Sequence, residues 1–295
     1  MRPRVHRCRD RRQPADGDPA AGRAARSSII VVDFHSHTSH SDGTLSPAEL
    51  IARMRARGVS WLSITDHDTT RAYDELESAG LRVVPGIEIN TTWNGNEVHV
   101  LGFRVPTGAS PLADVTERNR AHRRARIDTM VAGLNGAGYP VTVEQVLAES
   151  VGAHALGRPH VAKALVRNGM ISDVQAAFDQ LLSRGKPGYA PSHHITPREA
   201  IELVVATGGV PVLAHPGRLK DETIVEELAG HGLAGLEVFY PTHSTAQIAH
   251  YRALAARLGL VMTAGSDFHD PRWNARGVGM DVDEPDIRPF LDLVA

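Results

Sequence analysis

The feature that most constrains this chain is a pair of histidines at the end of a short apolar strand. Residues 29–32 are β-branched and typical of a buried strand, and His35 and His37 follow them closely. Because side chains alternate along a strand, His35 and His37 point to the same face, where two imidazoles can hold one divalent metal ion. The nearby Gly43 permits a sharp turn that can return Asp42 to the same place. A single pair of this kind is often incidental, so its interpretation depends on the rest of the chain.

Polar side chains recur at the ends of the other predicted strands. They lie in the segments Ser-Asp-Gly-Thr, Thr-Asp-His-Asp, Gly-Ile-Glu, Ala-His-Pro-Gly and Ser-Asp-Phe-His. Histidines that only pack do not need this arrangement, and active sites of parallel β/α folds assemble at the carboxyl ends of strands. We therefore predict a site with more than one metal ion. Besides the first histidine pair, the candidate residues are His67, Glu88, His215, Asp267 and His269, with His99 inside a strand.

The composition limits the ligands of such a site. Cys8 is the one cysteine among 295 residues, which excludes an internal disulfide and a cysteine-based zinc cluster. The chain has 16 histidines, so imidazole and carboxylate are the ligands at hand. No apolar stretch is long enough to cross a bilayer, and the first 28 residues lack the apolar core of a secretory signal. We therefore expect a cytoplasmic protein without membrane contact.

Strands and helices alternate on both sides of a long stretch without strand signals. Strands are predicted over residues 29–32, 60–65, 81–89, 97–103, 210–214, 233–240 and 258–264. Asn94-Gly95 is a strong hairpin signal, and the segments 46–49 and 196–199 are capping boxes that begin helices. The alternation indicates parallel strands with crossover helices, arranged in a closed or distorted β/α barrel rather than an open sheet.

Two parts of the chain depart from this alternation. Residues 1–28 contain eight arginines and three aspartates and almost nothing to bury, so we predict a disordered Arg-rich tail. A basic arm that touches nucleic acid is the alternative, although charge runs are usually only solvated. Residues 29–295 are predicted to form one barrel domain, interrupted by a helical insertion over residues 106–190.

The order and spacing of these segments resemble the polymerase-and-histidinol-phosphatase (PHP) family of metal-dependent phosphoesterases. The resemblance runs from about residue 29 to residue 279 and includes the HxH opening, Thr-Asp-His-Asp, Gly-Ile-Glu and Ser-Asp-Phe-His. Ser-Asp-Gly-Thr, Gly-Arg-Pro-His and His-Pro-Gly resemble a stand-alone branch. That branch includes nucleoside monophosphate and 3′,5′-bisphosphate phosphatases and 5′–3′ exoribonucleases. The resemblance implies an α/β fold, namely a distorted TIM-like (β/α)7 barrel with a helical insertion.

The resemblance also implies two to three divalent metal ions, which in this family are Mn²⁺, Fe²⁺ or Zn²⁺. The first metal would take His35, His37, Glu88 and Asp267. The second would share Glu88 and add His99 and His215, and the third would take Asp42, His67 and His269. Asp42 stands where some family members have histidine, which favours harder, oxygen-preferring metals at the third position.

Substrate contacts are predicted in Gly-Arg-Pro-His, at the start of a helix in the insertion. A guanidinium can bind phosphate bidentately, and the helix N-terminus adds partial positive charge, so we expect Arg158 and His160 to contact substrate. Asp66 and Asp68 are expected to orient His67 or to cap a helix. The arginines between residues 118 and 126 are expected to form a solvated helix face, with nucleotide or RNA contact as the alternative. The residues predicted to take part in catalysis are Glu88, His215, Asp267 and Arg158.

We predict a phosphoesterase that hydrolyses phosphate monoesters of nucleotides, either nucleoside monophosphates or 3′,5′-bisphosphates, through attack by a metal-activated hydroxide. The alternative is a 5′–3′ exoribonuclease acting on short 5′-phosphorylated RNA. A histidinol phosphatase and a non-catalytic PHP scaffold fit less well, because Gly-Arg-Pro-His favours the other branch and every expected ligand type is present. An amidohydrolase would often need a carbamylated lysine on a central strand, and none of the three lysines lies on one.

Overall fold

The computed structural model describes residues 28–150, 156–191, 194–272 and 274–295. The tail predicted over residues 1–28 lies outside the described residues except for Ser28. None of the described helices is both long and apolar enough to span a bilayer.

The described strands form two sheets. In the four-stranded sheet the order is β3-β2-β1-β9, and in the five-stranded sheet it is β4-β5-β6-β7-β8. The first sheet consists of β1 (Ile29–Asp33), β2 (Trp61–Leu62), β3 (Arg82–Val83) and β9 (Met280–Asp283). The second consists of β4 (Gly86–Trp93), β5 (Asn96–Phe103), β6 (Val210–Leu213), β7 (Gly235–Phe239) and β8 (Val261–Ala264).

The predicted alternation of parallel strands does not hold at β5, whose hairpin with β4 the sequence also predicts, or at β9, where no strand is predicted. Strand β5 is antiparallel to both β4 and β6, and β9 is antiparallel to β1. The cause at β5 is the predicted hairpin, in which Asn94 and Gly95 have positive φ angles of 48° and 72°. This geometry makes a two-residue turn that reverses the chain. The remaining neighbours are parallel, so the fold is mixed α/β.

The two sheets meet at the end of β1 and again beyond β2. The Phe34 amide donates to the Ala264 carbonyl at 2.9 Å, and the Asp267 amide donates to the His35 carbonyl at 2.7 Å. An isolated parallel bridge joins His67 to Glu88. These contacts bring predicted ligands from both sheets together. The strand pairings of the described residues do not form one closed sheet, and the (β/α)7 barrel stays a prediction.

Helices cover the sheets and begin where the sequence signals predict. Helix α1 (Pro47–Arg57) starts at a capping box on Ser46 and ends at Gly58, whose φ of 81° suits glycine. Helix α6 (Pro197–Ala206) starts at the second capping box, on Thr196. The other elements of this part are η1 (Arg71–Asp74), η3 (Pro216–Arg218), α7 (Thr223–Ala229), α8 (Thr245–Leu258) and α9 (Glu284–Val294).

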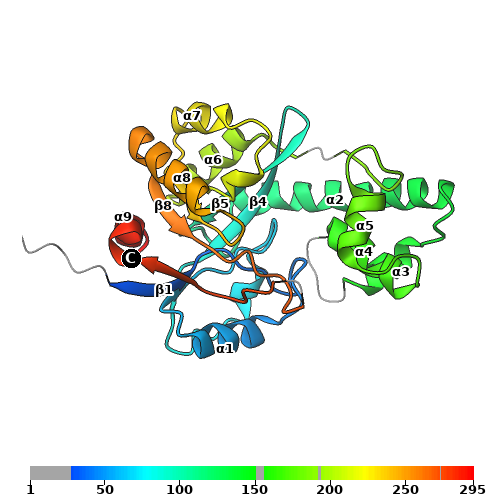
Figure 1. Cartoon of the computed structure of the whole chain (residues 1–295), viewed down its shortest axis with the longest axis horizontal. Coiled ribbons are helices and arrows are strands. Elements are labelled where there is room, and N and C mark those ends of the chain that lie inside the picture. The colour runs from blue at the N-terminus through cyan, green and yellow to red at the C-terminus, as the bar shows by residue number, and fades with distance from the viewer. Residues whose placement is uncertain (1–27, 151–155, 192–193, 273) are drawn as a thin grey trace, which may run out of the picture.

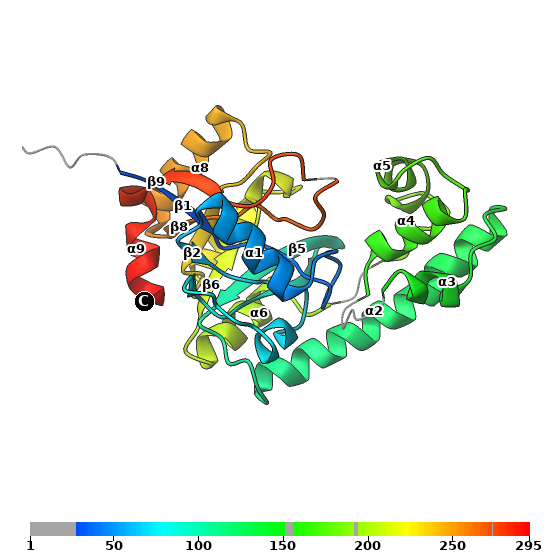
Figure 2. The same cartoon turned by 90° about the horizontal axis from the view of Figure 1, so that it is seen from below.

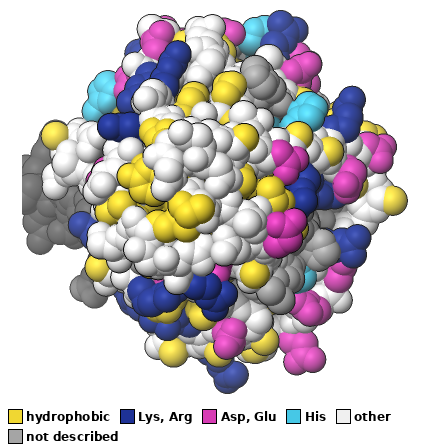
Figure 3. Space-filling model, turned by 90° about the vertical axis from the view of Figure 1, so that its right-hand side faces the viewer, with side chains coloured by type: hydrophobic (Ala, Val, Ile, Leu, Met, Phe, Trp, Pro, Cys, Tyr) yellow, Lys and Arg dark blue, Asp and Glu magenta, His cyan; other side chains and the backbone are white. Residues whose placement is uncertain are grey.

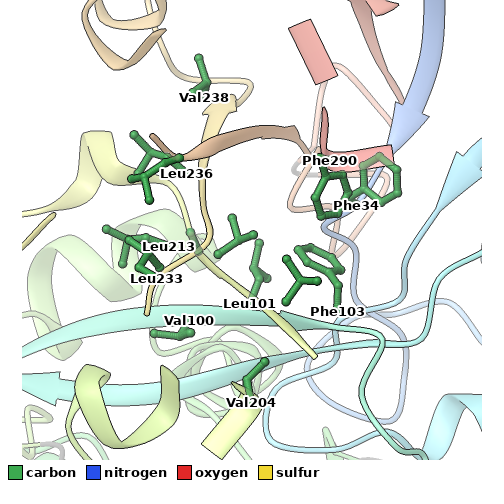
Figure 4. Close-up of a cluster of buried hydrophobic side chains, with 14 of the residues drawn as sticks. Phe34, Val100, Leu101, Phe103, Val204, Leu213, Leu233, Leu236, Val238 and Phe290 are labelled. Atoms are coloured by element: carbon green, nitrogen blue, oxygen red, sulfur yellow. The ribbon is translucent and has the colours of Figure 1, made fainter. Parts of the chain in front are cut away.

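The main hydrophobic core lies between the two sheets and α6 to α9. Figure 4 shows its centre, where Phe34 directly follows β1, and Phe103 and Phe290 come from β5 and α9. Their ring centroids lie 4.8 to 6.1 Å apart in edge-to-face contacts. A smaller cluster under α1 includes Leu50, Met54 and Phe268. The core thus fixes Phe34 and Phe268, the neighbours in sequence of His35 and His269.

The described part of the predicted helical stretch consists of helices and connecting turns, without a strand. It consists of α2 (Pro111–Gly136), α3 (Val143–Ala148), α4 (Arg158–Arg167), α5 (Val174–Ala177) and the π-helix η2 (Phe178–Leu182). Figures 1 and 2 show α3, α4 and α5 gathered along the far end of α2, to one side of the sheets. Their side chains form a separate hydrophobic cluster that includes Met130, Leu165 and Leu182. We call residues 111–182 the helical unit and the rest of the described chain the sheet unit; the predicted domain bounds stay a prediction.

Candidate metal centre

Four predicted ligands converge on one point at the junction of the two sheets. The Nε2 atoms of His35 and His37 lie 3.3 and 3.2 Å from Oε2 of Glu88. The same two nitrogens lie 3.4 and 3.3 Å from Oδ1 of Asp267. His35 and His37 come from the end of β1, Glu88 from β4, and Asp267 from the segment after β8. These four residues form a group that could hold a metal ion.

The donor atoms of this group fit a metal ion on two observations. Adjacent donors of a tetrahedral site with bonds of about 2.0–2.2 Å lie roughly 3.3–3.6 Å apart, close to the distances found here. In addition, Nε2 of His35, Nε2 of His37 and Oε2 of Glu88 are buried and have no hydrogen-bond partner. Buried polar atoms are almost always satisfied, so unpaired atoms that face one another indicate a ligand site.

Two further groups of donors adjoin the first. One contains His37, Asp42, His67 and His269, with Nε2 of His269 3.2 Å from Oδ1 of Asp42. That Oδ1 atom is also buried and has no hydrogen-bond partner. The other group contains His67, Glu88 and His99, with Nδ1 of His99 2.7 Å from Oε1 of Glu88. These three groups bring together eight of the nine predicted ligands.

The grouping of these residues differs in three respects from the layout that the family resemblance implies. His67 accompanies Glu88 and His99 in the third group, and His37 joins Asp42, His67 and His269 in the second. His215 belongs to none of the three groups, although its Nε2 lies 3.3 Å from Oε1 of Glu88. The structure thus brings His215 to the centre, while its role as a ligand stays a prediction.

Backbone conformation at the centre is unusual. Asp68, His215 and Asp267 have positive φ angles of 51°, 28° and 50°, which side-chain-bearing residues rarely adopt. Such strain persists where the surrounding structure enforces it, and it is common at functional sites. Close packing adds a constraint at Gly265, because a Cβ there would lie 2.2 Å from the Cβ of His35.

The electrostatics of the centre favour a bound cation. Burial raises the pKa values of Asp42, Glu88 and Asp267, but the surrounding histidines outweigh this effect and hold each carboxyl pKa well below its usual range. Burial lowers the pKa of His35, yet Glu237, Glu88 and Asp267 raise it well above the usual value. The carboxylates therefore remain ionised, and a metal ion can take the place of protons on the histidines.

Neighbouring residues hold the ligands in place. Asp66 does not contact His67 as expected; it accepts hydrogen bonds from Thr38 and Ser41 and so holds the loop after His37. Asp68 accepts two hydrogen bonds from Asn90, whose Nδ2 lies 3.2 Å from Nδ1 of His67. Two further residues act in the same way: Tyr240 donates to Asp267 at 2.7 Å, and Glu237 contacts His35 at 3.0 Å.

A pocket of about 300 Å³ opens beside the metal-binding groups. Its wall includes Asp42, His67, Glu88, His99, His215, Asp267 and His269 from the sheet unit. Four arginines also line it: Arg123, Arg126 and Arg158 from the helical unit and Arg218 from η3. A pocket that combines cation-binding groups with arginines suits an anionic ligand.

The expectation that the arginines of α2 form a solvated face is wrong for Arg123 and Arg126. Arg123 is 8% exposed and its Nε lies 3.1 Å from Oδ2 of Asp68. Arg126 pairs with Glu97 at 2.8 Å. Sequence periodicity did not reveal this because α2 is polar on several faces, and the partner carboxylates lie far away in sequence.

The two predicted substrate contacts have different positions. Arg158 lines the pocket and is held by Glu97, 2.6 Å from its Nη2, and by the ring of Phe178. His160 is 2% exposed and does not line the pocket. Its Nδ1 accepts a hydrogen bond from the Gly157 amide at 3.0 Å, so it caps the start of α4. Burial lowers the pKa of His160 to about 4.

The sequence patterns did not single out Glu97, Asn90, Tyr240 or Glu237. For Glu237 a signal exists, because it is the one charged residue in the apolar strand β7 and is fully buried. A carboxylate in such a strand needs a partner, which indicates a site. Glu97 and Tyr240 carry no comparable local signal.

Comparisons with known proteins agree with this geometry. A family model described as the PHP domain matches residues 33–187. The 3′,5′-nucleoside bisphosphate phosphatase of Chromobacterium violaceum is 33% identical over 269 residues, covering 88% of this chain and 94% of the relative. The 5′-3′ exoribonuclease Rnm of Salmonella typhimurium is 34% identical over 253 residues, covering 82% and 86%.

A solved structure leads to the same result. A Bifidobacterium adolescentis protein assigned as a metal-dependent phosphoesterase superposes with a TM-score of 0.81 at 32% identity, covering 92% of this chain and 98% of that chain. Together with the family match and the donor groups at the sheet junction, this likeness shows that the chain belongs to the PHP domain family of metal-dependent phosphoesterases.

Proposed function

We propose that the chain hydrolyses phosphate monoesters of nucleotides, with nucleoside monophosphates or 3′,5′-bisphosphates as substrates. The observation that carries this proposal is the arrangement of buried, unpaired donor atoms from His35, His37 and Glu88 beside an arginine-lined pocket. The donors suit divalent metal ions, and the arginines suit phosphate oxygens. The names of the two similar enzymes, a nucleoside bisphosphate phosphatase and an exoribonuclease, support a nucleotide substrate.

The proposed metal layout follows the one that the resemblance implies. His35, His37, Glu88 and Asp267 would hold one ion. Glu88, with His99 and with His215 or His67, would hold a second, and Asp42, His67 and His269 a third. We propose Mn²⁺, Fe²⁺ or Zn²⁺ as the metals, because the ligands are imidazole and carboxylate. When bound, these ions would lower the pKa of water and neutralise charge on the phosphate.

The residues of the chain then position the substrate. Arg158 and Arg126 present N–H groups to the pocket from the helical unit, where they can bind phosphate oxygens bidentately. Arg218 lies 3.2 Å from Oδ2 of Asp267 and can contact both the ligand shell and the substrate. The helical unit forms one side of the pocket.

The size of the pocket favours a small substrate over a long RNA. A volume of about 300 Å³ lies at the lower end of the range for small-molecule sites. On the face drawn in Figure 3, Lys and Arg side chains are interspersed with Asp and Glu around an uncharged centre. The described residues on that face therefore form no continuous basic track for a nucleic acid backbone. Exoribonuclease activity on short 5′-phosphorylated RNA is the second candidate function. The similarity of the chain to the Salmonella enzyme favours it.

Phosphate release by manganese-loaded protein tests the proposal. The substrates are AMP, 3′-phosphoadenosine 5′-phosphate, histidinol phosphate and a short 5′-phosphorylated RNA that is also scored for mononucleotides. The Asp267→Ala variant controls for a contaminating phosphatase. Phosphate from the nucleotides that is lost in this variant supports the proposal. Mononucleotides released from RNA with little free phosphate would favour the exoribonuclease over the phosphatase. If the protein binds metal but releases no product from any substrate, both candidate functions are refuted.

A further inference from the structure

We propose that Glu237 is a positioning residue that holds His35 and His215, and through them two of the proposed metal positions, in one arrangement. This inference rests on the proposed metal centre but not on which phosphate ester is the substrate. Glu237 lies on β7, between the strands that precede His215 and Asp267. It is fully buried, and no predicted ligand set includes it.

Each oxygen of the Glu237 carboxylate has a different partner. Oε1 lies 3.0 Å from Nδ1 of His35. Oε2 accepts a hydrogen bond from the backbone amide of His215 at 2.7 Å. The Glu237 carboxylate therefore connects His35 of the first group to His215, whose Nε2 lies 3.3 Å from Oε1 of Glu88.

The chemistry of His35 explains why a carboxylate is needed. The Nε2 atom of His35 faces Glu88 and Asp267, so Nδ1 must carry the proton when Nε2 binds a metal ion. Nδ1–H then donates to Glu237, which fixes the tautomer and the ring orientation. Both groups that face Glu237, the imidazole N–H and the His215 amide, are donors. A carboxylate satisfies both, whereas a glutamine of the same shape has one acceptor oxygen and must point its NH₂ group at a donor.

The backbone around Glu237 is adapted to this contact. His215 has a φ of 28°, a conformation that needs support from its surroundings. The hydrogen bond from its amide to Glu237 supplies such support at the strained residue itself. On the other side, a Cβ at Gly265 would lie 2.5 Å from Oε1 of Glu237, so glycine leaves the room that the carboxylate occupies.

The test is the affinity of the full-length, metal-free protein for Mn²⁺, measured by competition with a chelating dye. We expect Glu237→Gln to weaken Mn²⁺ binding about 10–100-fold, the usual effect of losing such a partner. The phosphatase activity of this variant should recover when Mn²⁺ is raised in proportion. The matched control is Glu222→Gln, which removes another His–carboxylate pair, 2.7 Å from His250 on the surface, and should leave the affinity unchanged.

The outcomes separate this inference from the proposed function. Unchanged affinity in Glu237→Gln together with weak binding in Asp267→Ala overturns the role of Glu237 and leaves the metal centre standing. Unchanged affinity in both variants overturns the metal centre itself. If Glu237→Gln does not fold, histidine ¹H–¹⁵N spectra of the wild-type protein loaded with Zn²⁺ decide the matter. The inference requires His35 as the Nδ1–H tautomer, and the opposite tautomer would refute it.

Discussion

The sheet unit and the helical unit contribute different chemistry to one pocket. All nine predicted ligands come from the sheet unit, where buried carboxylates and histidines face one another. Three of the four arginines that line the pocket come from the helical unit. The two units also have separate hydrophobic clusters. The reacting centre therefore depends mainly on the main core and the arginine wall mainly on the second cluster, while Leu112 in the main core and the ion pair between Arg123 and Asp68 connect the two units.

The largest effect is expected at the centre of the sheet unit. Glu88 contacts histidines through both oxygens, at 3.3 Å from Nε2 of His35 and 2.7 Å from Nδ1 of His99. Glu88→Gln should lower kcat/KM about a thousandfold, because metal ions supply several kcal/mol of transition-state stabilisation. Steady-state kinetics and metal content by mass spectrometry check this. Full activity with unchanged metal content would contradict the assignment of Glu88 as a metal ligand.

A smaller effect of another kind is expected in the helical unit. Arg158→Ala should raise KM for nucleotides about 10–100-fold with little change in kcat, since a charged hydrogen bond to phosphate contributes about 1.5–3 kcal/mol. Arg167→Ala is a control on the same helix, because Arg167 is exposed and pairs with Glu149 away from the pocket. A loss of kcat in Arg158→Ala without a change in KM would place Arg158 in the chemical step. The helical unit would then contribute to the reaction itself and not only to substrate binding.

The ion pairs between the units predict a pH-dependent contribution to stability. Burial raises the pKa of Glu97, but Arg158 and Arg126 outweigh it and hold this pKa well below its usual range. Glu97 therefore stabilises the fold fully above its unfolded pKa of about 4.3, and this contribution is lost as the pH falls towards the lower folded pKa. We expect Glu97→Gln to lower Tm by a few degrees at pH 7 and by less at pH 3.5. An equal difference at both pH values in thermal melting would exclude this linkage.

The smallest effects concern helix caps. Thr142 caps α3 in the helical unit, and Thr196 caps α6 in the sheet unit, each within a capping box. Either Thr→Ala change should cost about 1 kcal/mol of unfolding free energy. Because the hydrophobic clusters are separate, we expect Thr142→Ala to speed hydrogen exchange in α2 to α4 and to leave β6 and β7 unchanged. Faster exchange throughout the chain would show that the two units unfold together.

The sequence was sufficient for the local features of this fold. The capping boxes at Ser46 and Thr196, the hairpin at Asn94-Gly95 and the helical character of the insertion predicted over residues 106–190 depend on neighbours in the chain. The ligand residues could also be found, because they follow apolar strands in a recurring pattern. Their spacing was specific enough to indicate the family that the comparisons later showed.

Only the tertiary structure decided which side chains meet. Sequence periodicity could not reveal that β5 also runs antiparallel to β6, that Arg123 and Arg126 line the pocket, or that His160 caps α4. Nor could it pair Glu237 with His35, about two hundred residues away. Local patterns determine which residues are apolar, helical or able to bind metal. The partner of a buried charge depends instead on strand order and on contacts between distant segments, which form only in the folded chain.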